Sequence, residues 1–586
     1  MKRLWFLGIL WIAVACVLVS GIGITPTSVP PAASVRDATA TAALPSPSAT
    51  STSSPMPTST VSPTPTTAPT STPTSVSDPA LLADQVYVYP QPLIAGDRVT
   101  FDVVPLLPQN NYEDVEVAIT LPSGETLTRQ VVQQGFDQQQ RARFIWAWDT
   151  QGLSGSQIVT LTLNLPAGVI DLDPKNNHLG LSLTLQPPER LAPPGSDIRW
   201  RSTETAGVRL YYLTGSAAER DLTEIVDLAS SASAEVRARL QSGPSQMLNI
   251  YLLDRVLGQG GYAASDWVAI SYVDRAYAPA NLEMLLRHEL THHLDGDLGC
   301  DDAPALLREG LAVMVAGGHY WPTSLPRKAA VLPGTDAYIL LSTLVEDFYQ
   351  HQHEIAYLEA GALLVYLQEA PGMQRIESLC RAASSGEGSD LEKLSGAFVK
   401  HDLGDLVEVE QDWLRWLGAL HPTSQEAQAL NLEIRYLETL RAYQARYDRV
   451  ANFRKGVLFS PTAAMQAGIT ADFVRDPDVP EAIALELLLR LAQEKIRRQD
   501  LARVSALLNN VQYALEHAPP WDGVAQDVFK VAEALLVEGY EPYQVLDKPA
   551  QGGWLIYALD RANWPAQRQL WAAQDDAGRW IVTGPQ

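Results

Sequence analysis

The sequence predicts a multidomain chain in which a β-sandwich is followed by an α+β domain, a helical region and a small α+β tail. Three observations lead to this fold class. The chain has 586 residues, enough for several domains. Residues 79–188 contain short segments of alternating apolar and polar side chains, whereas residues 423–520 show only helical periodicity. Between these regions, strand-like segments precede helical ones, which is typical of an α+β domain.

Changes in composition and periodicity divide the chain into six predicted parts. These parts are a signal peptide or membrane anchor at 1–24, a disordered stalk at 25–78, an immunoglobulin-like β-sandwich at 79–188, an α+β domain at 195–421, a helical region at 422–520 and a small α+β unit at 521–586.

The N-terminal segment predicts export from the cytoplasm. Lys2 and Arg3 precede an uncharged apolar run from Leu4 to Ile24. That run is long enough to cross a bilayer, which takes about 20 residues. Positive charges before such a run keep the N-terminus inside and direct the following chain outward. The sequence leaves open whether the run is cleaved, so we expect an extracytoplasmic protein that is either membrane-anchored or secreted.

The stalk and the overall charge narrow the range of partners. Residues 25–78 consist almost entirely of Pro, Ser, Thr and Ala, a composition that buries no core and forms an extended tether. The net charge is −24, so the chain repels phosphate backbones and no nucleic acid is expected as a partner.

Period-two segments such as R-V-T-F-D-V-V and I-V-T-L-T-L-N-L predict the strands of the sandwich. Pro-Ser-Gly at 122–124 predicts a hairpin turn. We expect this part to act as a spacer or as the docking module for a cell-surface partner.

The predicted α+β domain contains the densest group of histidines. Strands are expected at 208–213, 247–253 and 267–273, and a helix is expected to begin at about Leu282. That helix carries R-H-E-L-T-H-H-L-D-G-D, in which three of the chain's 10 His lie within six positions. His288 and His292 are four residues apart, so both imidazoles lie on one helix face and can bind one Zn²⁺. Glu289 is expected to act as the general base toward a zinc-bound water.

A catalytic zinc needs a third protein ligand, and the sequence offers several. An extended motif ending in a third His is excluded, because Asp295 and Leu298 occupy its last two required positions. A carboxylate from the adjacent loop is one alternative, and the candidates are Asp297, Asp301 and Asp302. The favoured alternative is Glu309 in the apolar segment 304–318.

Glu309 is favoured because its surroundings are otherwise apolar. An unpaired buried carboxylate costs several kcal/mol, and a metal ion removes that cost. Sixteen residues separate His292 from Glu309, which is enough for a helix end, a loop and an antiparallel helix.

The motif resembles a known group of enzymes. H-E-L-T-H-H-L-D-G followed by L-L-R-E-G-L-A is similar to the gluzincin metallopeptidases, in particular the peptidase MA-like family, which is related to the aminopeptidase N and leukotriene-hydrolase catalytic domain. Y-L-E-A-G-A-L-L-V-Y-L at 357–367 resembles a further helix of that family. The resemblance implies zinc as cofactor and a role for Tyr357 in stabilising the oxyanion. Residues 79–188 resemble, more loosely, the CARDB sandwich domains.

Departures from the family pattern limit what the resemblance implies. No G-A-M-E-N-like strand precedes the motif, and the corresponding edge strand W-V-A-I-S-Y-V lacks a carboxylate. Aminopeptidase specificity is therefore not implied. His351 and His353 are expected on a solvated helix face. Cys300 and Cys380 either form a disulfide in an oxidising compartment or remain two thiols.

These observations lead to two functional hypotheses. The first is an extracytoplasmic zinc metallopeptidase that hydrolyses the bonds of a peptide or protein substrate, with Glu289 activating a zinc-bound water. The second is a non-catalytic, membrane-tethered surface binding protein with a structural or vestigial zinc site. Hydrolysis of a non-peptide amide is a narrower variant of the first.

Overall fold

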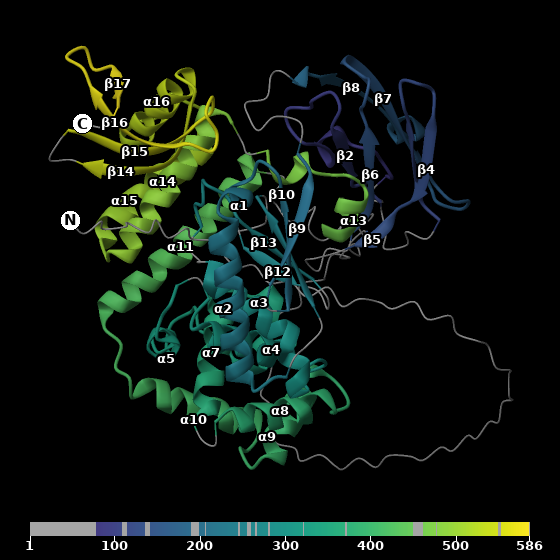
Figure 1. Ribbon diagram of the computed structural model, residues 1–586. Coiled ribbons are helices and arrows are strands. Elements are labelled where there is room, and N and C mark those ends of the chain that lie inside the picture. The colour runs from purple at the N-terminus through teal and green to yellow at the C-terminus, as the bar shows by residue number, and fades with distance from the viewer. Residues whose placement is uncertain are drawn as a thin grey trace, which may run out of the picture. The chain divides into compact units, whose positions relative to one another are not determined.

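The computed structural model describes most of the chain beyond the predicted stalk (Figure 1). The described ranges are 78–107, 114–134, 141–188, 198–205, 207–243, 247–254, 260–263, 267–278, 282–319, 321–369, 372–448, 461–475, 478–548 and 552–584. The apolar run at 4–24 and the stalk up to residue 77 lie outside these ranges. Within them, no helix combines the length and the apolarity that a membrane crossing requires.

The first described part consists of two antiparallel sheets with a shared core. One sheet has the order β1 (Val86–Tyr89), β2 (Arg98–Val103), β6 (Arg141–Asp149) and β5 (Val132–Gln134). The other has the order β4 (Thr126–Gln130), β3 (Glu116–Thr120), β7 (Gly155–Asn164) and β8 (His178–Leu185). Inward side chains such as Phe101, Val117 and Leu161 are fully buried between them. The predicted hairpin turn joins β3 to β4, where Gly124 adopts a φ of 85°.

A five-stranded sheet follows, in the order β12 (Gly261–Ala263), β13 (Trp267–Ser271), β11 (Leu248–Leu253), β10 (Val208–Leu213) and β9 (Trp200–Thr205). The strands β10, β11 and β13 are parallel, and both edge strands run antiparallel to their neighbours. The three predicted strands of this region are thereby confirmed. Helices α1 (Ala217–Arg220) and α2 (Leu222–Leu240) connect β10 to β11.

Three helices beside this sheet carry the predicted site residues. They are α3 (Leu282–Leu294), α4 (Ala305–Ala316) and α7 (His353–Gln368), and the short η5 (Asp295–Leu298) follows α3. Helices α4 and α7 cross at two glycines. A Cβ on Gly310 would lie 2.7 Å from the Ala360 carbonyl oxygen, and one on Gly361 would lie 2.5 Å from Val313 Cγ1. Because neither glycine has a side chain, the two helix backbones approach closely.

Further helices complete the core around these three. They are α5 (Leu325–Ala329), α6 (Leu341–Glu346), η6 (Phe348–Gln350), α8 (Met373–Ser384), α9 (Asp390–Lys400) and α10 (Leu406–Gly418). Their buried side chains belong to one continuous cluster that includes Leu344, Ile376, Phe398 and Trp413.

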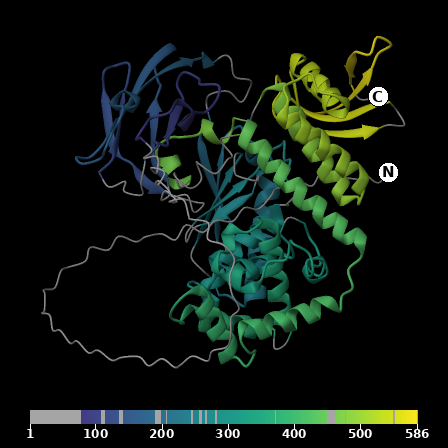
Figure 2. The same cartoon turned by 180° about the vertical axis from the view of Figure 1, so that it is seen from behind.

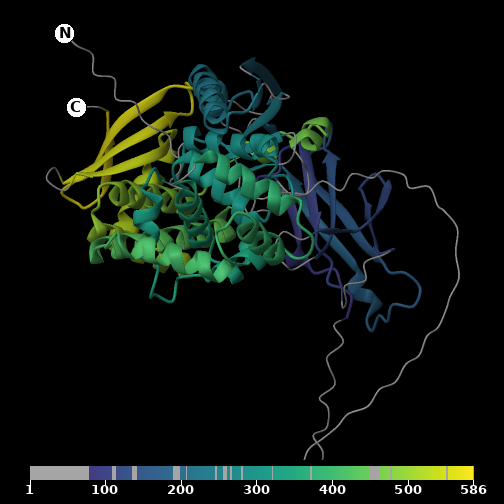
Figure 3. The ribbon, with the colours of Figure 1, turned by 90° about the horizontal axis from the view of Figure 1, so that it is seen from below.

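The C-terminal residues form a second mixed core. Its helices are α11 (Ser424–Tyr447), α14 (Pro480–Arg497), α15 (Leu501–Glu516) and α16 (Gly523–Val537). Its sheet has the order β14 (Tyr540–Lys548), β15 (Gly553–Asp560), β16 (Gln567–Gln574) and β17 (Trp580–Thr583), drawn in yellow in Figure 3. Side chains from these helices and strands share one cluster, so the predicted helical region and tail bury their apolar faces against each other.

Helix α11 links the two cores, as the view from behind shows (Figure 2). Leu430, near its start, belongs to the first core, and Tyr436 and Leu440 belong to the second. Between α11 and α14, helix α13 (Pro461–Gln466) and η7 (Ala471–Phe473) pack against Tyr251 and Trp267 of the five-stranded sheet.

Glu359 on α7 is a buried acid outside the histidine cluster. It is 0% exposed. Its Oε1 accepts a hydrogen bond from the Ile339 backbone nitrogen at 3.0 Å, and its Oε2 has no hydrogen-bond partner among the described residues. Burial raises the pKa of Glu359 well above its ordinary value, the backbone hydrogen bond opposes this shift, and nearby Glu410 adds to it.

This raised pKa predicts how stability depends on pH. The folded chain keeps a proton on Glu359 that the unfolded chain releases above its ordinary pKa of 4.5, so this group costs stability as the pH rises. Glu359→Gln mimics the protonated acid. We expect its Tm to exceed that of the parent by roughly 2–4 °C at pH 8 and to equal it near pH 4. Calorimetry of both proteins at pH 8 and near pH 4 checks this prediction. If the difference in Tm between variant and parent is the same at both pH values, the prediction is wrong.

Candidate metal centre

Helix α3 places two imidazoles of the motif side by side. His288 and His292 are one turn apart, both are buried, and their Nε2 atoms lie 3.2 Å from each other. The i, i+4 spacing alone accounts for this pairing, since such residues share one helix face.

Helix α4 brings Glu309 to the same point. Its Oε2 lies 3.2 Å from His292 Nε2 and 3.5 Å from His288 Nε2. Donor atoms at three corners of a tetrahedron around Zn²⁺, each about 2.0–2.1 Å from the ion, lie about 3.3 Å apart. The three atoms therefore have the spacing of a zinc-binding triad, and two imidazoles with one carboxylate are a ligand set that zinc accepts.

The charges at the triad are strongly coupled. Burial by itself lowers the pKa of His292, but Glu309 and Asp295 together raise it to about 10. Burial by itself raises the pKa of Glu309, yet His292 and His288 hold it well below its ordinary value. A fully buried carboxylate thus keeps its negative charge because the histidines face it.

Glu289 lies at the edge of the five-stranded sheet. It is 0% exposed. A Cβ built on Gly261 of β12 would lie 3.0 Å from Glu289 Oε1 and 3.0 Å from the Ala269 carbonyl oxygen. The absence of a side chain at Gly261 therefore leaves room for the carboxylate between strand and helix.

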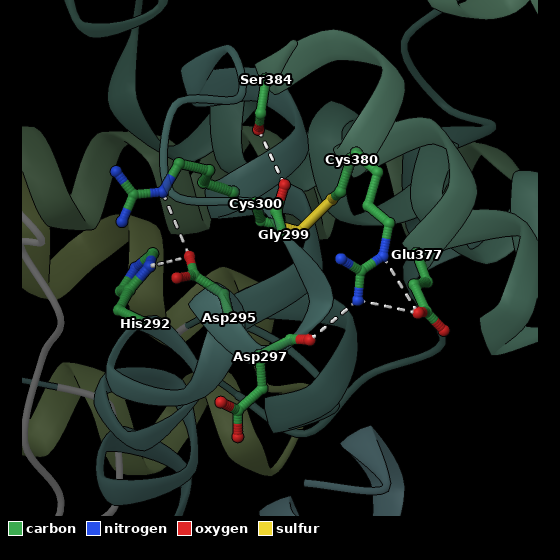
Figure 4. The surroundings of a disulfide bond; sticks show 10 residues. His292, Asp295, Asp297, Gly299, Cys300, Glu377, Cys380 and Ser384 are labelled. Carbon is green, nitrogen blue, oxygen red and sulfur yellow. Dashed lines mark hydrogen bonds and ion pairs between the residues drawn. A yellow bond between two sulfur atoms is a disulfide. The ribbon is translucent and has the colours of Figure 1, made fainter. Parts of the chain in front are cut away.

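Asp295 lies beside His292, at the ring nitrogen that does not face the triad (Figure 4). Its Oδ2 lies 3.8 Å from His292 Nδ1, an ion-pair distance, and accepts a hydrogen bond from Arg308 Nε at 3.1 Å. A carboxylate at the second ring nitrogen orients a ligand imidazole. The sequence did not indicate this role, although Asp295 is only three residues from His292.

The loop acids considered as alternative ligands lie elsewhere. The Asp297 carboxylate accepts a hydrogen bond from the Ser242 hydroxyl, and Asp301 lies against Gly296. Asp302 is exposed. Among the described residues, the group that gathers for a metal consists of His288, His292 and Glu309.

Cys300 and Cys380 form a disulfide, which resolves the alternative that the sequence left open (Figure 4). The bond joins the loop after η5 to α8. Two hydrogen bonds support this connection, because Ser384 Oγ donates to the Gly299 carbonyl at 2.8 Å and Arg381 donates to the Asp297 carbonyl at 3.2 Å. The disulfide and these hydrogen bonds thus attach the segment that follows η5, which begins at Asp295, to α8.

Tyr349 on η6 is a further contact of the triad that the sequence did not indicate. Its hydroxyl donates a hydrogen bond to Glu309 Oε1 at 2.8 Å, while Oε2 faces the histidines. Tyr349 is 47% exposed. Tyr349 therefore fixes which carboxylate oxygen of Glu309 is turned toward the metal position.

Tyr357 lies in a stack of aromatic rings next to the triad. Its ring centroid is 6.3 Å from that of His288 and 4.3 Å from those of both His319 and His353. The prediction that His353 lies on a solvated helix face is wrong, because it begins α7 and packs on Tyr357, one turn further along. Burial, followed by His353 and His288, lowers the pKa of His319, so this imidazole is neutral.

The two tyrosines allow a paired prediction. Tyr349→Phe removes a hydrogen bond to a ligand, so we expect zinc affinity to fall by about 10–100-fold. The resemblance assigns Tyr357 to the oxyanion. In that role, Tyr357→Phe is expected to leave zinc affinity unchanged and to lower kcat by about 10²–10³-fold, the range for losing one oxyanion donor. Competition with a chromogenic chelator and steady-state kinetics separate the two effects. If both variants lose zinc equally, the assignment of Tyr357 to the oxyanion is wrong.

Comparisons with known proteins give limited similarity. No protein-family model and no curated protein matches the chain. An M1 zinc metallopeptidase from Deinococcus radiodurans is 15% identical, with a TM-score of 0.27 over 56% of this chain and 92% of that chain. An aminopeptidase N family protein from Idiomarina loihiensis is 10% identical, with a TM-score of 0.23 over 55% of this chain and 72% of that chain. Similarity this low assigns no family.

Proposed function

We propose that the chain is an extracytoplasmic zinc metallopeptidase that hydrolyses peptide bonds. The observation that carries this proposal is the convergence of two imidazole nitrogens and one carboxylate oxygen at 3.2–3.5 Å, with the buried carboxylate Glu289 next to the first histidine. Zinc held there supplies a Lewis acid that polarises a carbonyl and acidifies water.

The residues of the chain divide the remaining work. His288, His292 and Glu309 hold the ion, while Asp295 and Tyr349 orient two of these ligands. Glu289 takes the proton of the attacking water and returns it to the leaving amine, as a general base and then a general acid. Tyr357 donates a hydrogen bond to the carbonyl oxygen as negative charge develops on it.

Three features support a location outside the cytoplasm. The N-terminal run follows two positive residues, and the segment after it has the composition of a stalk. The disulfide between Cys300 and Cys380 is of the kind that is typical of proteins folding in an oxidising compartment. We propose that the enzyme is membrane-anchored or secreted and that the sandwich serves as its spacer or docking module.

Removing the metal from the full chain tests the function. We expect one zinc per chain, cleavage of a peptide library by the zinc-loaded protein, loss of cleavage with 1,10-phenanthroline and recovery on adding zinc. Mass spectrometry identifies the cleaved bonds. A zinc-loaded chain that cleaves no member of the library would instead support a non-catalytic surface binding protein.

A further inference from the structure

A cavity of about 560 Å³ opens in the C-terminal core. The end of α14, the start of α15 and the strands β14, β15 and β17 border it, whereas the metal centre lies on other elements. Its volume falls within the range of about 300–1,000 Å³ that is usual for small-molecule sites. The side chains at its wall that define its chemistry are two indoles and four charged groups, namely Trp554, Trp580, Lys495, Asp500, Arg503 and Asp547.

Both tryptophans lie on the inner face of the C-terminal sheet. Asp547 of β14 pairs with Trp554 of β15, and Trp554 pairs with Ala572 of β16. Ala572 pairs with Val582 of β17, two residues after Trp580. Paired residues and alternate residues of a strand point to the same face, so Trp580 lies on the face of Trp554 and Asp547. Both indoles pack against the second core, which holds them in place as the apolar part of the cavity wall.

The polar part of the wall has no net charge. Asp547 accepts hydrogen bonds from Lys495 Nζ at 2.7 Å and from Arg503 Nη2 at 3.0 Å. Burial by itself raises the pKa of Asp547, but the two cations hold it below its ordinary value. Asp500 is the fourth charged group, and its side chain accepts from the Arg503 backbone nitrogen at 3.3 Å. Two cations and two carboxylates therefore border the same cavity.

This charge balance selects among the ligands that the cavity admits. An anion or a cation would meet a like charge as well as an opposite one, and like charges side by side are unfavourable. A neutral ligand with many hydroxyls avoids this conflict, because a hydroxyl donates to a carboxylate and accepts from an ammonium or guanidinium group. A pyranose ring carries such hydroxyls at its rim and apolar C–H groups on its faces, which fit the indole rings.

We propose that the cavity binds a neutral oligosaccharide built of pyranose rings. The four charged groups orient its hydroxyls, and Trp554 and Trp580 contact the apolar face of a ring. This function adds a second site to the chain and depends neither on hydrolysis nor on zinc. With the location proposed above, the neutral glycans of a cell surface are the ligands within reach.

Isothermal titration calorimetry of the full, zinc-loaded chain tests the ligand class. The probes are two neutral trisaccharides, tri-N-acetylchitotriose and maltotriose, together with the cationic chitotriose and the anionic trigalacturonate. We expect at least one neutral trisaccharide to bind with a Kd of about 1 mM or lower, and each charged probe to bind at least about 10-fold more weakly. If neither neutral trisaccharide binds up to about 10 mM, or if a charged probe binds more tightly, the proposal is overturned.

Two variants test whether binding occurs in this cavity. Arg503→Gln removes a polar contact and Trp580→Ala an apolar one, and each is expected to weaken binding of the neutral trisaccharide at least about 10-fold. The Arg503 side chain is 31% exposed, so its substitution keeps the test valid even if the Trp580 variant does not fold. Unchanged binding by Arg503→Gln would contradict the assignment.

Trp571→Ala is the matched control. Trp571 of β16 pairs with Leu555 and Thr583, so its side chain lies on the opposite face of the same sheet. This variant should bind the neutral trisaccharide like the parent. Weakening equal to that of Arg503→Gln would show that the binding site is not the cavity between the sheet and the helices, and would also overturn the proposal.

Discussion

Glu289→Gln is expected to leave one zinc bound per chain and to lower kcat by about 10²–10⁴-fold, the usual contribution of a general base. Glutamine has the shape of the buried carboxylate and still fits against Gly261 of β12. It has no basic oxygen to take a proton from water. Zinc analysis and cleavage kinetics on the same preparation therefore separate loss of the base from loss of the metal.

Glu283→Gln is the matched control for this variant. Glu283 lies on the same helix and forms an ion pair with Arg287, but its side chain is 38% exposed. Its substitution should change neither zinc content nor kcat. If the Glu289 variant hydrolyses peptides as fast as this control, Glu289 is not the base and the proposed mechanism fails.

Glu309→Gln is expected to lower zinc affinity by more than about 100-fold, beyond the 10–100-fold that loss of a supporting contact produces. A neutral amide at this position removes the negative charge that faces both imidazoles. The rate of hydrolysis at limiting zinc should fall together with the zinc affinity. It should recover in part when zinc is in excess. Competition with a chelator of known affinity measures the change.

Glu359→Gln is the control that separates the loss of a zinc ligand from the loss of a buried carboxylate elsewhere in the domain. Glu309 and Glu359 are both 0% exposed glutamates on neighbouring helices, and only Glu309 faces the histidines. The Glu359 variant should bind zinc as tightly as the parent. If the Glu309 variant binds zinc as tightly as the parent, Glu309 is not a zinc ligand. The third ligand would then be one of the loop acids.

The elements that position the site were largely predictable from local patterns. Short strand-like segments predicted β10, β11 and β13, and the helical spacing of His288 and His292 placed both rings on one face. Glu309 was found by an energetic argument, since a lone acid in an apolar helix needs a partner. These inferences succeed because each depends on residues that are close in sequence.

The contacts that the sequence did not indicate join separate segments. Tyr349 reaches Glu309 across forty residues. His353, which begins α7, packs on His319, which lies in the segment after α4. The pairing of Cys300 with Cys380 spans 80 residues and was left open for the same reason. The merging of the helical region with the C-terminal sheet in one core likewise depends on faces that only meet after folding.

The sequence by itself determined the chemistry available at the site, namely two imidazoles one turn apart with an acid beside the first. Only the tertiary structure decided which distant acid completes the triad and which groups hold it in place. The physical reason is the crossing of α4 and α7 at Gly310 and Gly361. The close approach of these backbones sets the position of Glu309. The sequence pattern within a single helix does not determine how closely that helix packs against another.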